Sequence, residues 1–168
     1  EHIGRIFTPC NWSLLLRNGK TGNLRFVVVV GDASDTLSGV EVKKGKGLTG
    51  WIADHGVPII IEDVSRDHRF DNTFDKMSGF ETKSIIGVPL KSNRKDFGVI
   101  ELVNKLDGSV FTAHDLKILT TIADFAAIAI EKAYYLSNLK KMANVDPLTG
   151  VYNRRFLLFY LDKELKRN

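Results

Sequence analysis

Few cysteines and no long apolar run limit what this sequence can be. Cys10 is the one cysteine among 168 residues, so neither an intrachain disulfide nor a CxxC or zinc pattern is available. The longest apolar runs, at 26–30, 57–61 and 125–130, are far shorter than the roughly 20 residues that cross a bilayer. We therefore expect a reducing, cytoplasmic setting, no membrane contact in this stretch, and Cys10 as a small buried hydrophobic residue.

The placement of charge and histidine argues against two further kinds of site. The net charge is +4, but the Lys and Arg pairs are scattered and no nucleic-acid-binding motif appears, so no nucleic-acid partner is expected. The four histidines show no ligand spacing with carboxylates, so no metal site is expected. The chain does not begin with Met and has no signal-peptide pattern, and residue 1 is therefore expected to lie inside a longer protein.

Apolar runs separated by turn residues predict an antiparallel sheet of five or six strands. The expected strands lie at 12–17, 24–30, 40–43, 57–61, 84–90 and 97–103. The segments 18–22 and 92–96 read as hairpin loops. A helix is expected over 48–55, and the polar segment 65–79, with a short helix at 73–77, is expected to cover part of the sheet.

One long helix is predicted over 113–143, because that segment contains no Gly or Pro. Its apolar residues alternate spacings of three and four, typical of a coiled-coil seam, at Leu119, Ile122, Ala126, Ala129, Ala133 and Leu136. One face of its first half is expected to cover the sheet, and another to pair with a second copy. We therefore expect a homodimer joined along 119–136. Pro147 ends the pattern, and a second apolar helix is expected at 154–166.

A series of short motifs lies between Gly47 and Ala133. In chain order they read GLTGW at 47–51, GVP at 56–58, Asp63, DHRF at 67–70, SGFETKS at 78–84, VPL at 88–90, GV at 98–99 and LVNK at 102–105. Together they resemble the GAF family of sensory domains. The resemblance implies an α+β, GAF-like fold over 1–138, with most of the family's first helix missing, followed by a long C-terminal signalling helix.

The GAF resemblance also implies a ligand pocket between the sheet and the cover segment 65–80. Seven residues match ligand-lining positions of members that bind cyclic nucleotides: Leu48, Thr49, Asp71, Asp75, Ser78, Thr82 and Glu101. The resemblance favours a purine cyclic nucleotide, although Asp71 stands where an aromatic ring would stack on the base. If Glu101 points inward, a ligand must satisfy its carboxylate; otherwise it points outward or accepts hydrogen bonds from Thr82 and water.

A second GAF feature joins the last strand to the long helix. Asn104, Lys105, Phe111 and Asp115 resemble the Asn-Lys and Phe-x-x-x-Asp-Glu signature of phosphodiesterase-type members, with Leu116 in place of the second acid. We expect a structural clip through a Lys105–Asp115 ion pair. A ligand contact is not expected there.

Residues 146–155 read DPLTGVYNRR, and Val151 stands where the matching motif has Leu. Otherwise they resemble the DxLTGLxNRR opening of the GGDEF family of diguanylate cyclases, through Asp146, Leu148, Thr149, Asn153, Arg154 and Arg155. The resemblance implies that 144–168 is the truncated start of such a domain in a bacterial signalling protein. Asp146 with Arg154 or Arg155 forms either a polar clasp or an ordinary helix start.

The cyclase resemblance sets what chemistry to expect. The complete domain would condense two GTP into cyclic di-GMP with magnesium, but its catalytic motifs lie beyond this opening. The chain itself is therefore not expected to be an enzyme. Three functions remain open: a small-molecule sensor that controls the cyclase through a dimeric helix, a ligand-free dimerisation module, and an independent GAF enzyme. The first is favoured, and the third is disfavoured because no catalytic Cys or activated nucleophile appears in the sequence.

Overall fold

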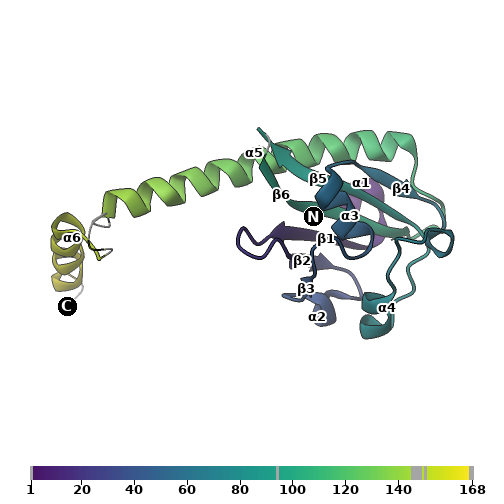
Figure 1. The fold of residues 1–168 in the computed structure, drawn as a ribbon, viewed down its shortest axis with the longest axis horizontal. Helices are drawn as coiled ribbons and strands as arrows, with labels where there is room; N and C mark the ends of the chain where they lie inside the picture. Colours follow the sequence, from purple (N-terminus) through teal and green to yellow (C-terminus); the bar gives the residue numbers. More distant parts are fainter. Residues whose placement is uncertain (1, 94, 145–148, 150, 167–168) are drawn as a thin grey trace. The chain divides into compact units, whose positions relative to one another are not determined.

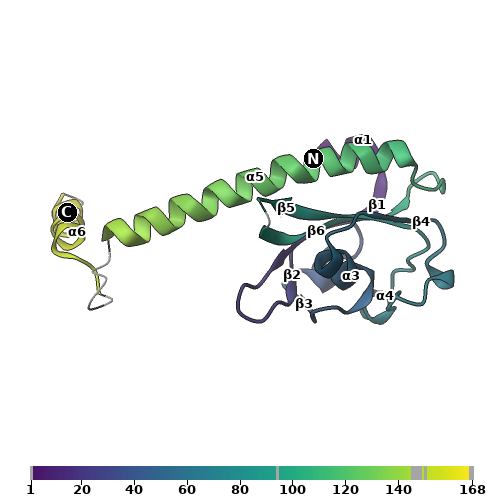
Figure 2. The same cartoon turned by 45° about the horizontal axis from the view of Figure 1, so that its top comes forward.

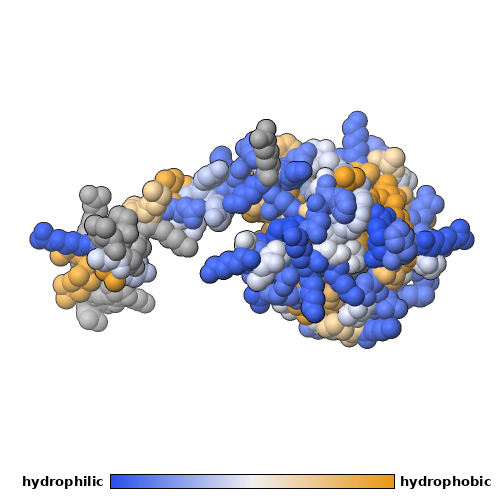
Figure 3. Space-filling model, in the orientation of Figure 1, coloured by the Kyte–Doolittle hydropathy of each residue, from blue (hydrophilic) through white to orange (hydrophobic). Residues whose placement is uncertain are grey.

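The computed structural model describes residues 2–93, 95–144, 149 and 151–166. The chain divides into two compact units, one reaching to Ile128 and the other starting at Ala129. Among the described residues, no helix is both long enough and apolar enough to cross a membrane. Figure 3 shows mostly polar side chains, with smaller apolar patches between them, over one face of the first unit.

A six-stranded antiparallel sheet forms the centre of the first unit (Figure 1), in the order β3-β2-β1-β6-β5-β4. The strands are β1 (Pro9–Arg17), β2 (Leu24–Val30), β3 (Glu41–Val42), β4 (Ile59–Ile61), β5 (Ile85–Ser92) and β6 (Lys95–Lys105). The six strands confirm the expected α+β, GAF-like sheet. β4 begins after Pro58, which has no N–H to donate to the sheet ladder. β5 and β6 pair as far as Ser92 and Lys95, so the expected loop at 92–96 is mostly strand.

Helices cover both faces of this sheet. In the first unit these are α1 (His2–Phe7), α2 (Ser34–Leu37), α3 (Gly47–His55), the 3₁₀ turn η1 (Val64–Arg66), α4 (Thr73–Ser78) and the start of α5 (Ala113–Asn144). The last helix, α6 (Arg154–Leu165), belongs to the second unit. Figure 2 shows α1 and the start of α5 on one face and α3 and α4 on the other. The long helix and the helices near 48–55, 73–77 and 154–166 match expectation, whereas α1 and α2 have no counterpart in the sequence prediction.

The central strands send alternate residues to the two faces. Ile100 and Leu102 are buried on the side of α5, while Leu15 and Val99 are buried with α3 on the opposite side. α3 packs closely on β5, and Gly87 allows this approach, because a Cβ at that position would collide with the Ile52 side chain. The core is therefore double-layered, and odd-numbered positions of β6 face α3.

The buried stripe of α5 corrects the predicted dimer seam. Leu119, Ala123 and Ala127 are fully buried at spacings of four, which is how a helix packs along its own sheet. Leu119 is therefore unavailable to a second copy. The exposed large apolar residues of α5 are instead Phe125, Ile128, Tyr134, Tyr135, Leu136, Leu139 and Met142.

Cys10 is a smaller correction. It is partly exposed, not buried, because it alternates on β1 with the buried Pro9 and Asn11.

Candidate functional site

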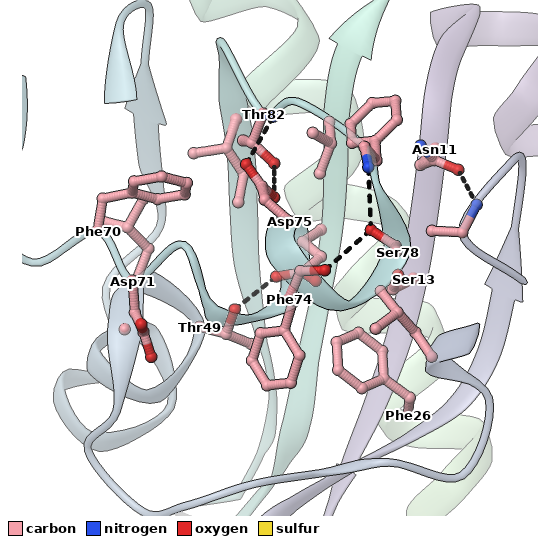
Figure 4. A pocket seen from close by; sticks show the side chains of 18 of the residues that line it. Asn11, Ser13, Phe26, Thr49, Phe70, Asp71, Phe74, Asp75, Ser78 and Thr82 are labelled. Carbon is pink, nitrogen blue, oxygen red and sulfur yellow. Dashed lines mark hydrogen bonds between the residues drawn. The ribbon is translucent and has the colours of Figure 1, made fainter. Parts of the chain in front are cut away.

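A cavity of about 80 Å³ lies between the α3-facing side of the sheet and the segment that carries α4 (Figure 4). All seven predicted pocket residues line it: Leu48, Thr49, Asp71, Asp75, Ser78, Thr82 and Glu101. The residues come from α3, the α4 segment and β6, which are separated in the sequence. The fold thus assembles the predicted set around one space.

Glu101 lies on the floor of the cavity at the centre of β6. Its carboxylate is almost completely buried, and Thr49 Oγ1 on α3 donates a 2.6 Å hydrogen bond to Glu101 Oε2. Within the described residues, Thr49 is its one side-chain partner. The alternative in which Glu101 accepts a bond from Thr82 is not observed, because the Thr82 hydroxyl donates to Asp75. Burial raises the pKa of Glu101 to about 7, and the Thr49 bond offsets only part of that effect.

Thr82 instead holds the cover in place. Its backbone N–H and hydroxyl donate to the two carboxylate oxygens of Asp75, over 2.8 and 2.7 Å. Ser78 tightens the end of α4 by donating to the Phe74 carbonyl and accepting from the Phe80 N–H. We call the Asp75–Thr82 pair the cover latch, because it ties α4 to the segment that leads into β5.

Asp71 faces the rim of the cavity. Its carboxylate accepts from Thr73 and lies 3.3 Å from the Lys46 ammonium. The Thr73 hydroxyl bond, more than the Lys46 charge, lowers the pKa of Asp71, against the effect of burial.

Aromatic rings are nevertheless present, although Asp71 itself supplies none. The cavity is lined by Phe26, Phe70, Phe74 and Phe80. Phe26 and Phe74 meet edge to face with ring centroids 5.5 Å apart. The cavity therefore has aromatic surface although position 71 is an aspartate, and the residues that supply it were not among those matched to the family.

Sequence reasoning also missed two polar residues on β1. Asn11 and Ser13 line the cavity and are each only 4% exposed. Asn11 Oδ1 accepts from the Ala33 N–H at 3.1 Å, while Asn11 Nδ2 is buried without a partner among the described residues. The available signal was their period-two spacing on a strand whose other inward residues are apolar.

Comparison with known proteins then identifies the domain. A family model described as GAF domain matches residues 3–130. The chain belongs to the GAF family. It is therefore a sensory and regulatory domain, as the motifs between Gly47 and Ala133 indicated.

Two curated relatives of this GAF domain are cyclic-nucleotide phosphodiesterases. A dual 3',5'-cyclic-AMP and -GMP phosphodiesterase 11A from Takifugu rubripes is 36% identical over 104 residues, which cover 61% of this chain and 12% of the relative. The phosphodiesterase 11 of Drosophila melanogaster, with the same dual description, is 33% identical over 95 residues, or 56% of this chain and 6% of the relative. The chain thus spans only a small part of either enzyme.

Solved structures agree on the fold. The GAF domain of a phosphoenolpyruvate-protein phosphotransferase from Coxiella burnetii has a TM-score of 0.72 at 17% identity, covering 81% of this chain and 80% of that one. The corresponding Acinetobacter domain has a TM-score of 0.69 at 20% identity, covering 81% and 79%. At these identities the similarity concerns the fold alone.

The predicted clip joins β6 of the GAF domain to α5. Lys105 Nζ donates to Asp115 Oδ2 at 2.8 Å, and the two side chains are only 14% and 15% exposed. Thr112 and Asp115 also cap the helix start reciprocally. Burial acts to raise the pKa of Asp115, but the bonds from Lys105 and Thr112 together lower it. Phe111 is buried beneath the pair, its ring centre 5.5 Å from Lys105 Nζ.

Asn104, predicted as part of the clip, instead binds the backbone of residues 81–84. Its side chain accepts from the Lys83 and Ser84 N–H groups and donates to the Glu81 carbonyl, all within 3.0 Å. Asn104 therefore holds the stretch between the cover and β5, whereas the contact with α5 is made by Lys105.

The motif at 146–155 is only partly described. Asp146, Leu148 and the side chain of Arg155 lie outside the described residues, so the expected clasp is not tested. Asn153 joins α5 and α6: its Nδ2 donates to the Ala143 carbonyl in the last turn of α5, and its Oδ1 accepts from the Phe156 N–H in α6. Arg154 then begins α6 as an exposed residue. Thr149 is described, within the turn between α5 and α6.

Proposed function

We propose that this GAF domain is the ligand-sensing input module of a signalling protein and that its cavity binds a purine cyclic nucleotide. The observation that carries the proposal is Glu101, a buried carboxylate with one hydrogen bond at the floor of a cavity lined by aromatic rings. A buried carboxylate with few partners is costly, and a ligand N–H would compensate it. The two curated relatives, which are named for cyclic AMP and cyclic GMP, support the same ligand class.

The size of the cavity sets a condition on binding. Its volume is about 80 Å³, whereas pockets for ligands of nucleotide size measure about 300–1,000 Å³. A cyclic nucleotide therefore enters only if the α4 segment moves outward, which requires the cover latch at Asp75 and Thr82 to rearrange. Such a displacement couples ligand binding to a change in the domain.

We further propose that the output passes through α5 in a homodimer. Phe125, Ile128, Tyr135, Leu139 and Met142 are exposed and follow heptad spacing, with Lys132 at the remaining position. On a regular helix Phe125 and Ile128 lie opposite the stripe that packs on the sheet. The Lys105–Asp115 clip connects this helix to β6, the strand that carries Glu101.

The protein that this module controls is, in our proposal, a diguanylate cyclase whose domain begins near 144. The support is the motif at 146–155. The test is to assay the longer protein that contains this chain for cyclic di-GMP synthesis from GTP and magnesium, with and without added cyclic nucleotide. Synthesis that responds to the cyclic nucleotide supports control of a cyclase by this GAF domain. A longer protein without a GG(D/E)EF motif contradicts it.

A thermal-shift experiment distinguishes a ligand-binding sensor from a ligand-free dimerisation module. The small volume of the cavity is consistent with the second function as well. A ligand that binds only the folded state raises the melting temperature according to its concentration relative to Kd. We expect cyclic AMP or cyclic GMP to raise it and GTP to have no effect. If neither cyclic nucleotide raises it, the dimerisation module is the better description.

A further inference from the structure

Three buried polar side chains stand side by side on the two central strands of the sheet. Asn11, Ser13 and Glu101 all line the cavity and are 4%, 4% and 6% exposed. Ser13 pairs directly with Glu101, and Asn11 pairs with Val103. Asn11 is therefore a diagonal neighbour of Glu101, about 7–8 Å away between backbone positions. Apolar residues would fill this part of a core with a smaller desolvation penalty. The row formed by Asn11, Ser13 and Glu101 is therefore expected to have a function.

Asn11 offers a donor that no described residue uses. Its Oδ1 accepts from the Ala33 N–H, which fixes the orientation of the amide and leaves Nδ2 buried without an acceptor. The loop before Ala33 fits tightly around this amide, since a Cβ at Gly31 would collide with Asn11 Oδ1. The fold thus holds the donor in place, and a buried donor of this kind calls for an acceptor.

Glu101 and Ser13 complete the row. Thr49 occupies Glu101 Oε2, and within the described residues no donor reaches the other carboxylate oxygen or the Ser13 hydroxyl. The other charged residues of the lining are engaged elsewhere, Lys46 with Asp71 and Asp75 with Thr82. Along the floor the protein therefore presents a donor, a hydroxyl of either sense, and an acceptor.

We infer that Asn11, Ser13 and Glu101 form the deep recognition end of the cavity and read a lactam edge, in which a C=O lies beside an N–H. The C=O accepts from Asn11 Nδ2, and the N–H donates to Glu101. This inference rests on the proposed function, because it names the edge by which a purine cyclic nucleotide is held. Guanine and hypoxanthine carry such an edge. Adenine carries the reverse pattern, which sets its amino group against the Asn11 donor.

Calorimetry with three matched nucleotides tests the inference on the full 168-residue chain. Cyclic GMP and cyclic IMP share the lactam edge and differ in the 2-amino group, whereas cyclic AMP lacks the lactam. We expect both lactam nucleotides to bind at least about tenfold more tightly than cyclic AMP, since the mismatch leaves buried polar groups unpaired.

Two variants test whether Asn11 and Glu101 cause the preference for the lactam nucleotides. Asn11→Asp keeps the oxygen that accepts from Ala33 but removes the donor, and Glu101→Gln keeps the size but replaces one acceptor oxygen by a donor. Each should cut the preference for the lactam nucleotides about tenfold or more. Asn18→Asp is the matched control, because Asn18 Oδ1 also accepts from backbone N–H groups, in the hairpin turn away from the cavity. It should leave all affinities unchanged. Glu101→Gln gives the answer if Asn11→Asp does not fold.

The outcomes are distinguishable. If the three nucleotides bind equally, or if cyclic AMP binds best, the lactam inference is overturned while the cyclic-nucleotide proposal stands. It is likewise overturned if the lactam nucleotides bind best but neither Asn11→Asp nor Glu101→Gln reduces that preference. If none of the three binds, the proposed function fails and the inference fails with it.

Discussion

Thr49 and Glu101 meet across the cavity, where the hydroxyl at the first turn of α3 donates a 2.6 Å hydrogen bond to the carboxylate on β6. This contact joins the Gly-rich start of a helix to the centre of the sheet. It also leaves the buried carboxylate with a single neutral partner, which explains why burial dominates its pKa. The pocket floor is therefore a place where protonation and binding affect each other.

The pH dependence of stability should carry the signature of Glu101. Its pKa is about 7 in the folded chain against 4.5 ordinarily, so the folded state binds its proton more tightly than the unfolded state does. Stability attributable to Glu101 is then highest below about pH 4.5, falls as pH rises to about 7, and stays low above that.

Replacing the ionisable group tests that sign. Glu101→Gln should gain stability relative to the wild type between about pH 5 and pH 8, by at most roughly 3 kcal/mol. Urea unfolding at both pH values measures the change. Glu81→Gln, at an exposed position, serves as the control. A difference between Glu101→Gln and wild type that is independent of pH would show that Glu101 keeps an ordinary pKa.

Loosening the cover latch should expose the cavity without unfolding the domain. Thr82→Val removes the 2.7 Å hydroxyl bond to Asp75 and keeps the shape and the backbone bond. We expect a loss of about 1 kcal/mol in stability and faster amide hydrogen exchange confined to 73–80. Thr120→Val is a control, because that hydroxyl bonds only within α5. Unchanged exchange at 73–80 would mean that the latch does not hold the cover.

The Lys105–Asp115 clip should contribute measurable coupling, because both side chains are largely shielded from water. A double-mutant cycle with Lys105→Met and Asp115→Asn isolates the pair, and we expect about 1–2 kcal/mol. The exposed Lys83–Glu81 pair, 3.6 Å apart, should give a value near zero in the same cycle. Equal values for the two pairs would remove the clip from the account.

The proposed dimer should depend on the exposed apolar residues of α5 that follow heptad spacing, Phe125, Ile128, Tyr135, Leu139 and Met142. Phe125→Glu with Leu139→Glu should give monomers in light scattering at tens of micromolar protein, since both positions are exposed and apolar. Lys117→Glu changes charge on an exposed position outside this set and should keep the dimer. A monomer mass for the unmutated chain would contradict the dimer itself.

Much of this arrangement could be predicted from the sequence, and particular residues show where prediction stopped. Apolar runs separated by turn residues predicted the six strands, and matching to a family placed seven residues that do line one cavity. Asn11 was missed because the predicted strand began at residue 12, whereas β1 begins at Pro9. Ser13 was missed because polar residues on a strand ordinarily face solvent, and β1's central place in the sheet buries it.

The seam of α5 shows a different limit. Leu119 and Ala126 fit spacings of three and four, but such spacing does not say which partner covers the face. In this chain Leu119 packs on its own sheet. Asn153 was grouped with a family motif, whereas its observed contacts are with the end of α5 and the start of α6.

The central claim is that the cavity above Glu101 binds a purine cyclic nucleotide, and titration calorimetry with cyclic AMP and cyclic GMP tests it most directly. We predict saturable binding of at least one of them with one site per chain. Glu101→Ala should weaken it at least about tenfold, because the floor of the cavity loses its acceptor. Glu81→Ala, an exposed neighbour of the cover, should bind as the wild type does. Absence of binding by both nucleotides, or undiminished affinity in Glu101→Ala, would contradict the account.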